Sequence, residues 1–499
     1  MLFEAFRLVF DPYVLGVILA SAAFGLFVGA VPGLTATMAT ALLVPVTFFM
    51  DPVPAIASIV TATAMAIFAG DIPSCLLRMP GTPASAAYTD EAYAMTRNGQ
   101  GELALGAGLV FSVIGGLFGT AVLIVAAPAL AEVALKFSSF EYFWLVSLGL
   151  LCAVFIEFAN PLKGIVSLLL GLLVASVGLD NPAGFPRFTF DNAELAGGLT
   201  LIPIMIGMFA VSEIIRSVSK IDEPWQMAQA QIGNVFRGMW RLTKQYKLPV
   251  LRGSVLGTAV GVLPGAGADI AAWMSYAVSK RFSKQPEKFG TGHIEGIIEA
   301  GASNNSALAG AWVPALVFGI PGDSITAIVI GVLYIKGLNP GPSIFINNAV
   351  SIYAIFMVFI LANLLMLPLG IAAIKSAKQL LRAPREALMP VILLFCVVGS
   401  FAINNSIFGV VLVLGFGLVG YLMEENGFPV APAILGMVLG AMLEEHFIRA
   451  MIRADGNFLV FFERPIAGSL GALTLIVVCV PLIRWMLRSR MKLPGGGTK

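Results

Sequence analysis

The chain has 499 residues, of which 58% are hydrophobic and only 12% are charged, and its formal net charge is +2. About a quarter of the residues of a soluble protein are charged, so this composition excludes an ordinary soluble domain, and the small net charge gives no indication of nucleic-acid binding. Apolar runs of near-spanning length recur from one end to the other. They predict an all-α polytopic membrane protein that lies mostly in the lipid bilayer, and no removable signal peptide is expected.

In chain order, the first notable feature is a Pro-Gly pair inside an apolar run. "GLFVGAVPG" (25–33) stops what would otherwise continue as a helix, and a second Pro-Gly pair follows in "RMPGTPASA". Pro cannot donate an interior helical hydrogen bond and Gly allows backbone to approach a ligand closely. We therefore predict two broken helices in this part of the chain, with candidate substrate contacts at Pro32, Gly33, Leu34, Thr35, Pro80, Gly81 and Thr82.

The same two motifs return later in the chain. "GTAVGVLPG" (257–265) repeats Gly-x-x-x-Gly-x-x-Pro-Gly 232 residues after its first copy, and "GIPGDSITA" repeats the second Pro-Gly pair 241 residues later. The pairs Asn160/Gly164 and Asn405/Gly409 match in the same order, as do Pro203/Gly207 and Pro432/Gly436. The equivalent candidate substrate contacts are Pro264, Gly265, Ala266, Pro321, Gly322, Asp323 and Ser324.

Four matches in one order predict a duplication. We assign residues 1–220 to a first membrane repeat and 249–460 to a second. Residues 221–248 form a cytoplasmic amphipathic connector, and 461–499 hold an extra C-terminal helix and a basic tail.

Basic loops indicate how the repeats are oriented. Lys and Arg gather on both sides of 253–279, which predicts that this segment enters and leaves the membrane on the cytoplasmic side as a hairpin. Residues 1–11 and 50–54, which flank the matching segment, carry only Arg7 and are predicted to be extracytoplasmic. Two inverted repeats with re-entrant hairpins and about 11 full crossings satisfy this pattern, and inverted repeats are a transporter architecture. The alternative is that 253–279 is one tilted helix and that the repeats are parallel.

Breaks at membrane depth are tolerated only where protein or a polar cavity satisfies the backbone. Each break presents the N–H groups of a half-helix, with about +0.5 charge at that end. Four such ends suit a di- or tricarboxylate anion. The simpler alternative is that Gly-x-x-x-Gly packs helices closely and that Pro-Gly merely kinks them.

Polar residues inside the apolar runs predict a cation site beside the breaks. Neutral oxygens and carboxylates suit a hard cation such as Na⁺, and an ionised Asp at the bilayer centre is costly unless water, a cation or substrate faces it. The candidate cation ligands are Ser303, Asn304, Asn305, Asp269 and Asp71. Asn side chains that only hydrogen-bond between helices remain an equal alternative.

Several motifs together resemble one transporter family. "PGLTATMATALLVPVTF", "MPGTPASAA", "GFPRFTF" (184–190), "EAGASNNSALAGAWVPALVFGIPG" and "GLNPGP" are similar to the TctA-type large membrane subunit of tripartite tricarboxylate transporters. The resemblance implies a bacterial inner-membrane secondary transporter for citrate-like carboxylates, coupled to Na⁺ (or H⁺) and without another cofactor. It also implies two partners, a small four-helix membrane subunit (TctB-like) and a periplasmic solute-binding protein (TctC-like), and suggests an elevator motion.

Other functions are less well supported by the sequence. It has two histidines and no His-Glu-x-x-His, Gly-x-Ser-x-Gly or Cys-x-x-Cys motif, so we do not expect an enzyme. It has no Gly-x-x-x-x-Gly-Lys-Ser/Thr loop for ATP. An anion channel, or an ion-coupled carrier without a binding protein, remains as the alternative function.

Overall fold

The computed structural model of the chain describes residues 1–156, 161–179, 184–219, 235–236, 238–381 and 385–491. Within these ranges the secondary structure is helical, apart from an isolated bridge between Gly178 and Arg187. The described helices fall into two compact units, and each unit takes segments from both halves of the sequence. This confirms the all-α prediction. Asn160 and most of the predicted connector lie outside the described residues.

The larger unit comprises Met1–Leu135 and Thr200–Asn426. Its first-half helices are α1 (Leu2–Val9), α2 (Pro12–Ala30), α3 (Ala36–Thr47), α4 (Pro52–Ala69), α5 (Asp71–Leu77), η1 (Ser85–Tyr88), α6 (Thr89–Arg97), α7 (Gly101–Ala134), α11 (Leu201–Ile206), η2 (Gly207–Val211) and α12 (Ser212–Ser219). The later helices are α13 (Met239–Gln245), α14 (Lys247–Val262), α15 (Gly267–Phe282), η3 (Pro286–Lys288), α16 (Ile294–Phe318), α17 (Ser324–Ile335), α18 (Ile344–Asn347), α19 (Ala349–Lys375), α20 (Ala377–Leu380), α21 (Arg385–Asn404) and α22 (Ile407–Glu425).

The smaller unit comprises Lys136–Leu199 and Gly427–Lys499. Its described helices are α8 (Ser139–Ile156), α9 (Pro161–Ala175), α10 (Ala193–Ala196), α23 (Val430–Arg453), η4 (Phe458–Phe462) and α24 (Pro465–Met491). An aromatic cluster joins them: Trp144 of α8 is buried and its indole N–H donates to the carbonyl of Phe461 at 3.0 Å.

Seven helices among the described residues are long and apolar enough to cross a membrane. They begin at Pro12, Pro52, Gly101, Leu201, Ala349, Ile407 and Val430. Shorter apolar helices include α3, α9 and α17. The chain is therefore a multi-pass membrane protein, while the number of 11 crossings stays a prediction.

The packing of the two halves repeats at the offsets seen in the sequence. A Cβ added to Gly25 or Gly29 of α2 would meet the carbonyls of Ala62 and Ala66 in α4. In the second half, the equivalent glycines of α14 would meet the carbonyls of Ser303 and Ala307 in α16, 241 residues after the first pair of partners. Close backbone contact between small residues is the usual way in which membrane helices associate. These equal contacts support the duplication.

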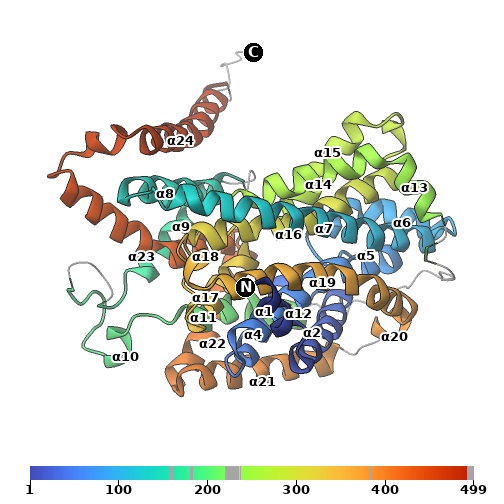
Figure 1. The fold of residues 1–499 in the computed structure, drawn as a ribbon, viewed down its shortest axis with the longest axis horizontal. Coiled ribbons are helices and arrows are strands. Elements are labelled where there is room, and N and C mark those ends of the chain that lie inside the picture. Colours follow the sequence, from blue (N-terminus) through green and yellow to red (C-terminus); the bar gives the residue numbers. More distant parts are fainter. Residues whose placement is uncertain (157–160, 180–183, 220–234, 237, 382–384, 492–499) are drawn as a thin grey trace, which may run out of the picture. The chain divides into compact units, whose positions relative to one another are not determined.

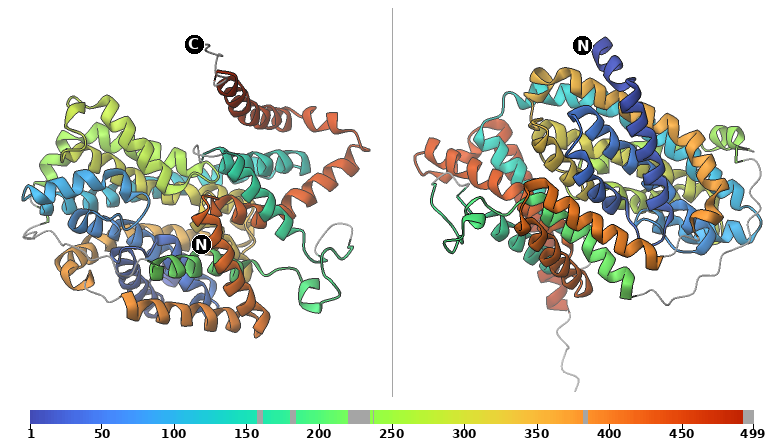
Figure 2. Two further views of the ribbon diagram at one scale, coloured as in Figure 1. Left: turned by 180° about the vertical axis from the view of Figure 1, so that it is seen from behind. Right: turned by 90° about the horizontal axis from the view of Figure 1, so that it is seen from below.

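The hairpin prediction for 253–279 agrees with the packing of α14 and α15 on α16. The contacts Gly253–Glu299 and Gly261–Ala307 show that α14 runs parallel to α16. The serine hydroxyl of α16 at position 303 donates to Ala271, whereas Gly296 lies against Tyr276, so α15 runs antiparallel to α16. The chain thus reverses direction at Pro264-Gly265, and α14 and α15 lie side by side in Figures 1 and 2.

Helices α7 and α19 hold equivalent places, each being the long helix that follows the second break of its half. Gly116 would meet Asn363, and Gly370 would meet Leu109 at 2.5 Å. The higher-numbered contact residue of α7 meets the lower-numbered one of α19, so the two equivalent helices are antiparallel. This is the arrangement that inverted repeats produce.

Contacts between the halves also agree with the predicted sides of the membrane. Glu91, which the inverted topology places on the cytoplasmic side, accepts hydrogen bonds from the backbone N–H groups of Gly292 and His293, both at 2.7 Å. If 253–279 were one tilted helix, Gly292 and His293 would lie on the opposite side. Lys336 donates to the carbonyl of Met50 at 2.6 Å, and the inverted topology places both outside.

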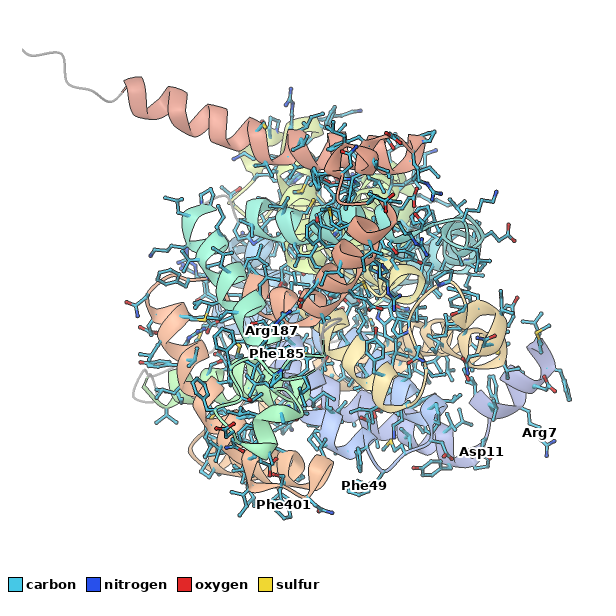
Figure 3. All side chains as sticks on the ribbon, turned by 90° about the vertical axis from the view of Figure 1, so that its left-hand side faces the viewer. Arg7, Asp11, Phe49, Phe185, Arg187 and Phe401 are labelled. Carbon is cyan, nitrogen blue, oxygen red and sulfur yellow. The ribbon has the colours of Figure 1, made fainter. Side chains whose placement is uncertain are left out.

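The smaller unit has two contacts of the same kind. The guanidinium of Arg187, labelled in Figure 3, forms two hydrogen bonds with the carboxylate of Glu444 at 2.9 and 2.6 Å. Arg464 pairs with Glu141 at 2.8 Å. The inverted topology places all four residues toward the outer side of the membrane, so both ion pairs support it.

The last helix of each half packs against a helix of the other half. Gly207 lies 3.0 Å (measured from an added Cβ) from the backbone nitrogen of Gly417, and Gly436 lies 3.0 Å from that of Leu172. Leu172 and Gly417 occupy equivalent positions in the two halves. This exchange explains why the compact units differ from the two halves of the sequence.

Candidate functional site

In each repeat, the first Pro-Gly break, at the tip of the hairpin, lies directly against the second break. A Cβ on Gly81 would lie 2.7 Å from the carbonyl oxygen of Gly29, at the end of α2. A Cβ on Gly322 would lie 2.7 Å from the carbonyl oxygen of Gly261, at the end of α14. Both positions therefore need glycine because backbone occupies the space where a side chain would be.

The breaks of different repeats also meet. The indole N–H of Trp273, in α15, donates to the carbonyl of Pro83 at 3.2 Å. The carboxylate of Asp269 lies close to the backbone of Ala84. On the other side, a Cβ on Gly267 would lie 2.7 Å from the Cβ of Asp323. The four breaks thus form one continuous series of contacts within the larger unit.

Two of the four breaks are followed by a helix with a side-chain cap, and at a third break Thr82 and Ser85 form a reciprocal pair of hydrogen bonds before η1. Thr35 accepts from the N–H of Met38 at 3.1 Å. Thr82 accepts from the N–H of Ser85 at 3.2 Å while Ser85 accepts from Thr82 at 3.1 Å. Such caps satisfy one of the free N–H groups at each helix start. The first-turn amides expected to hold the anion are therefore partly engaged already.

The fourth break shows how the two repeats differ. Asp323 forms a reciprocal capping box with Thr326, so the cap of α17 is a carboxylate and not the hydroxyl of Ser324. An anion approaching this helix end would compete with Asp323. Ala266, at the start of α15, makes no side-chain cap.

The predicted substrate contacts differ in how far solvent reaches them. Those that are buried are Pro32, Leu34, Gly81, Thr82, Ala266, Pro321 and Gly322. Those that are partly or fully exposed are Gly33, Thr35, Pro80, Pro264, Gly265, Asp323 and Ser324. The second group forms the accessible side of the breaks, and its contact with substrate stays a prediction.

Among the predicted cation ligands, the structure links Asp71 with Asn304. Asp71 begins α5 and is only 4% exposed. One carboxylate oxygen accepts the hydroxyl of Tyr88 at 2.6 Å, and the side chain of Asn304 lies within hydrogen-bonding reach of the same hydroxyl. The second carboxylate oxygen of Asp71 and the amide oxygen of Asn304 are buried without a hydrogen-bond partner. A buried carboxylate without a basic partner favours protonation or a bound cation.

Among the described residues, no hydrogen bond joins the other predicted cation ligands to Asp71. The Ser303 hydroxyl donates to the carbonyl of Ala271 at 3.0 Å and so tethers α15 to α16. Asp269 is exposed, and the amide of Asn305 is buried with neither its oxygen nor its nitrogen partnered. In the part of the chain that the structure describes, no three His, Cys, Asp or Glu side chains gather as a metal site.

Sequence analysis missed two residues that organise this region. Tyr88 is 1% exposed and joins the first repeat to α16. Glu91 is fully buried and accepts from Tyr276 at 2.8 Å, besides the backbone N–H groups of the loop before α16. Neither stands in a recognisable motif, because the partners that join them to the second half of the chain are about 200 residues away.

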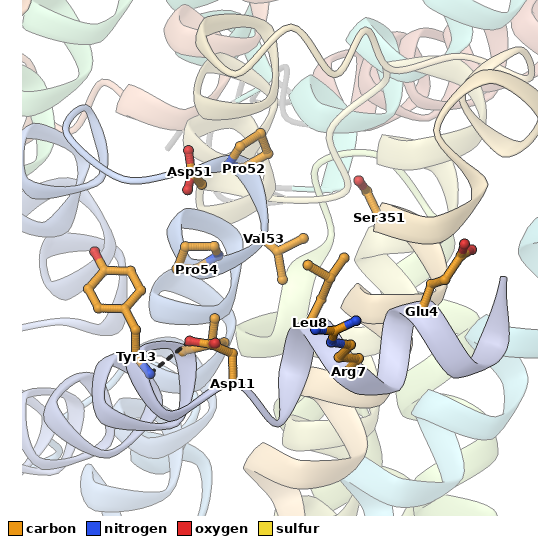
Figure 4. A pocket seen from close by; sticks show the side chains of 11 residues that line it. Glu4, Arg7, Leu8, Asp11, Tyr13, Asp51, Pro52, Val53, Pro54 and Ser351 are labelled. Atoms are coloured by element: carbon orange, nitrogen blue, oxygen red, sulfur yellow. Dashed lines mark hydrogen bonds between the residues drawn. The ribbon is translucent and has the colours of Figure 1, made fainter.

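An open pocket of about 770 Å³ lies elsewhere, where α1, α2, α4 and the start of α19 meet (Figure 4). Glu4, Asp11 and Asp51 line it together with Arg7. Three acids against one base do not favour a polycarboxylate. The breaks, not this pocket, remain the candidate anion site.

Comparison with known proteins gives the family. The model of the Tripartite tricarboxylate transporter TctA family matches residues 15–435. The chain belongs to the TctA family. It is 35% identical over 462 residues to an "Uncharacterized 52.8 kDa protein in TAR-I ttuC' 3'region" of Agrobacterium vitis, which covers 92% of this chain and 91% of that protein. An "Uncharacterized protein in TAR-II ttuC' 3'region" of the same organism is 37% identical over 227 residues, 46% of this TctA-family chain and 94% of that protein. No solved structure matches significantly.

Proposed function

We propose that this chain is the membrane-embedded carrier of a tripartite system that imports a di- or tricarboxylate anion across the bacterial inner membrane. Membership of a transporter family supports this role over an enzymatic one. The observation that carries the proposal is the continuous contact of four broken helices from two repeats. Transporter sites are built from such discontinuous helices at repeat interfaces.

Transport is coupled to Na⁺, or to H⁺ in its place, at Asp71 and Asn304. Their unpartnered oxygens support this assignment, because bringing a cation to a buried carboxylate offsets the cost of burying its charge. The protein works with a small four-helix membrane subunit and a periplasmic solute-binding protein, by alternating access of elevator type.

The test is uptake of radiolabelled citrate, malate and succinate by cells that express the chain with both partner subunits. We expect saturable uptake that fails when either partner is omitted and that falls when Na⁺ is replaced by choline at constant pH. Saturable uptake without the binding protein would instead indicate an independent carrier. Uptake that does not saturate would indicate a channel.

The cation site is tested by Asn304→Ala with Ser303→Ala as its matched control. The two residues are neighbours on α16 and both are buried, but only Asn304 has an unpartnered oxygen. We expect Asn304→Ala to raise the Na⁺ concentration for half-maximal uptake and Ser303→Ala to leave it unchanged. An equal effect of the two variants would assign Asn304 to helix packing.

A further inference from the structure

The turn that ends α5 holds an arginine in a backbone conformation that suits glycine. Arg78 has φ 58° and ψ 28°, in the left-handed region. At the equivalent turn of the second repeat, after α16, Gly319 has φ 68° and ψ 20°. Both turns also make the equivalent hydrogen bond to a proline carbonyl. The N–H of Met79 donates to Pro73 at 3.4 Å, and the N–H of Ile320 donates to Pro314 at 3.3 Å. The same turn is therefore made with glycine in one repeat and with arginine in the other.

The left-handed conformation costs free energy for any residue with a side chain, and the Arg78 side chain does not offset this by burial. It is 63% exposed, and its guanidinium donates to one oxygen of Asp90, in α6, at 3.0 and 2.9 Å. An exposed ion pair contributes little to stability. Backbone strain without a structural return points to a functional role.

Arg78 is also the basic residue nearest along the chain to any of the four Pro-Gly pairs, two positions before Pro80. Pro80 and Pro83 are the exposed residues of this break, and Trp273 of the other repeat donates to Pro83. The accessible side of the break thus has one strong cation at its edge, at the end that the topology places in the cytoplasm.

We propose that Arg78 binds a carboxylate group of the transported anion at the cytoplasmic mouth of the breaks, and that Asp90 forms an ion pair with Arg78 when substrate is absent. This inference rests on the proposed function. Guanidinium binds carboxylates through paired N–H donors, and Asp90 presents the same chemical group as the substrate. Because an exposed pair is weak, substrate exchanges with Asp90 at little cost.

The test compares four variants of the full chain, together with both partner subunits, in efflux of citrate, malate and succinate from preloaded membrane vesicles, so that the KM is the one for substrate on the cytoplasmic side. The thermal stability of each purified chain is measured as well. Arg78→Gly copies the turn of the other repeat, so we expect it to fold at least as well as the wild type and to raise the KM at least tenfold. Arg78→Lys keeps the charge but not the paired donors, so its KM should lie between that of the wild type and that of Arg78→Gly. Asp90→Asn should lower the KM, because it removes the competing carboxylate. The control Arg97→Gln changes an exposed arginine of the same helix as Asp90 and should leave the KM unchanged.

An unaltered KM in Arg78→Gly would overturn the inference and leave the proposed function intact. So would an equal rise in KM for Arg78→Gly and Asp90→Asn, since this would make the pair structural. Absence of carboxylate uptake by the wild-type system would overturn the proposed function, and this inference with it.

Discussion

The breaks of the two repeats are alike in backbone and different in side chains. Gly81 and Gly322 both lie 2.7 Å (from an added Cβ) from a hairpin-tip carbonyl, although 241 residues separate them. In contrast, Asp71 of the first repeat is matched by Trp312 in the second, and the cap Thr82 is matched by Asp323. A side chain at either glycine would overlap backbone atoms, so close backbone packing favours the same residue in both breaks. Side chains that face the interior of the breaks are free to differ, and this is where ion and substrate chemistry has been placed.

The largest expected effect on uptake comes from the acid that only one repeat has. Asp71→Asn keeps the shape and the hydrogen bond from Tyr88 but removes the charge. We expect uptake to fall tenfold or more, a loss equivalent to about 1.4 kcal/mol, with thermal stability unchanged or higher because a buried carboxylate is removed. Tyr88→Phe should have a smaller effect on uptake. Normal uptake by Asp71→Asn, with unchanged dependence on Na⁺ and pH, would rule out Asp71 as the coupling site.

A second difference between the repeats lies at the cytoplasmic end of the second hairpin. Arg252 pairs with Glu299 through two hydrogen bonds of 2.6 and 2.5 Å, and the Glu299 side chain is fully buried. The first repeat has Ala20 and Ser58 at these positions. Breaking a buried pair from one side costs about 3–5 kcal/mol, so Arg252→Ala and Glu299→Ser should each lower the thermal unfolding temperature strongly.

The double variant Arg252→Ala/Glu299→Ser copies the first repeat and removes both charges. We expect the double variant to be more stable than the sum of the two single losses would predict, because no unpaired charge remains. Additive single effects in thermal unfolding would show that the pair is not coupled, and that this end of the hairpin is held by other contacts.

Local sequence rules predicted the breaks, because a Pro-Gly pair acts within a few positions of itself, and repeated motifs predicted the duplication. They did not predict which side chains meet. Ser303 and Asn304 looked equivalent in the sequence, but successive residues of a helix point about 100° apart, so one tethers α15 and the other approaches Tyr88. Glu91 and the exchanged packing of Gly207 and Gly436 depend on contacts across the fold, which no local pattern contains.

The next prediction tests the shared backbone packing. Gly81→Ala and Gly322→Ala would each place a Cβ within 2.8 Å of backbone atoms, and overpacking costs about 1–3 kcal/mol. We expect both to lower the unfolding temperature by similar amounts. Gly16→Ala is the matched control, since a Cβ there meets nothing within 4 Å in the helix α2, and it should be neutral or stabilising. Unequal losses at Gly81 and Gly322 would mean that the two breaks are less alike than their contacts indicate.

The smallest effects are expected from exchanging the caps of the two repeats. Loss of a cap costs about 1 kcal/mol, so Asp323→Ala should lower stability by this amount. Thr82→Ala removes the hydroxyl that accepts from the N–H of Ser85, and the loss of one hydrogen bond should also cost about 1 kcal/mol. Thr82→Asp and Asp323→Thr keep a cap and exchange only the charge, so both should unfold within about 0.5 kcal/mol of the wild type, given how closely Thr and Asp rank as caps. Thr82→Asp should nevertheless weaken carboxylate uptake, because it adds a negative charge at a helix end that the anion is proposed to approach. If Thr82→Asp left the KM for all three carboxylates unchanged while its stability was preserved, the helix ends of the first repeat would not face the anion, and the difference between Thr82 and Asp323 would be one of capping alone.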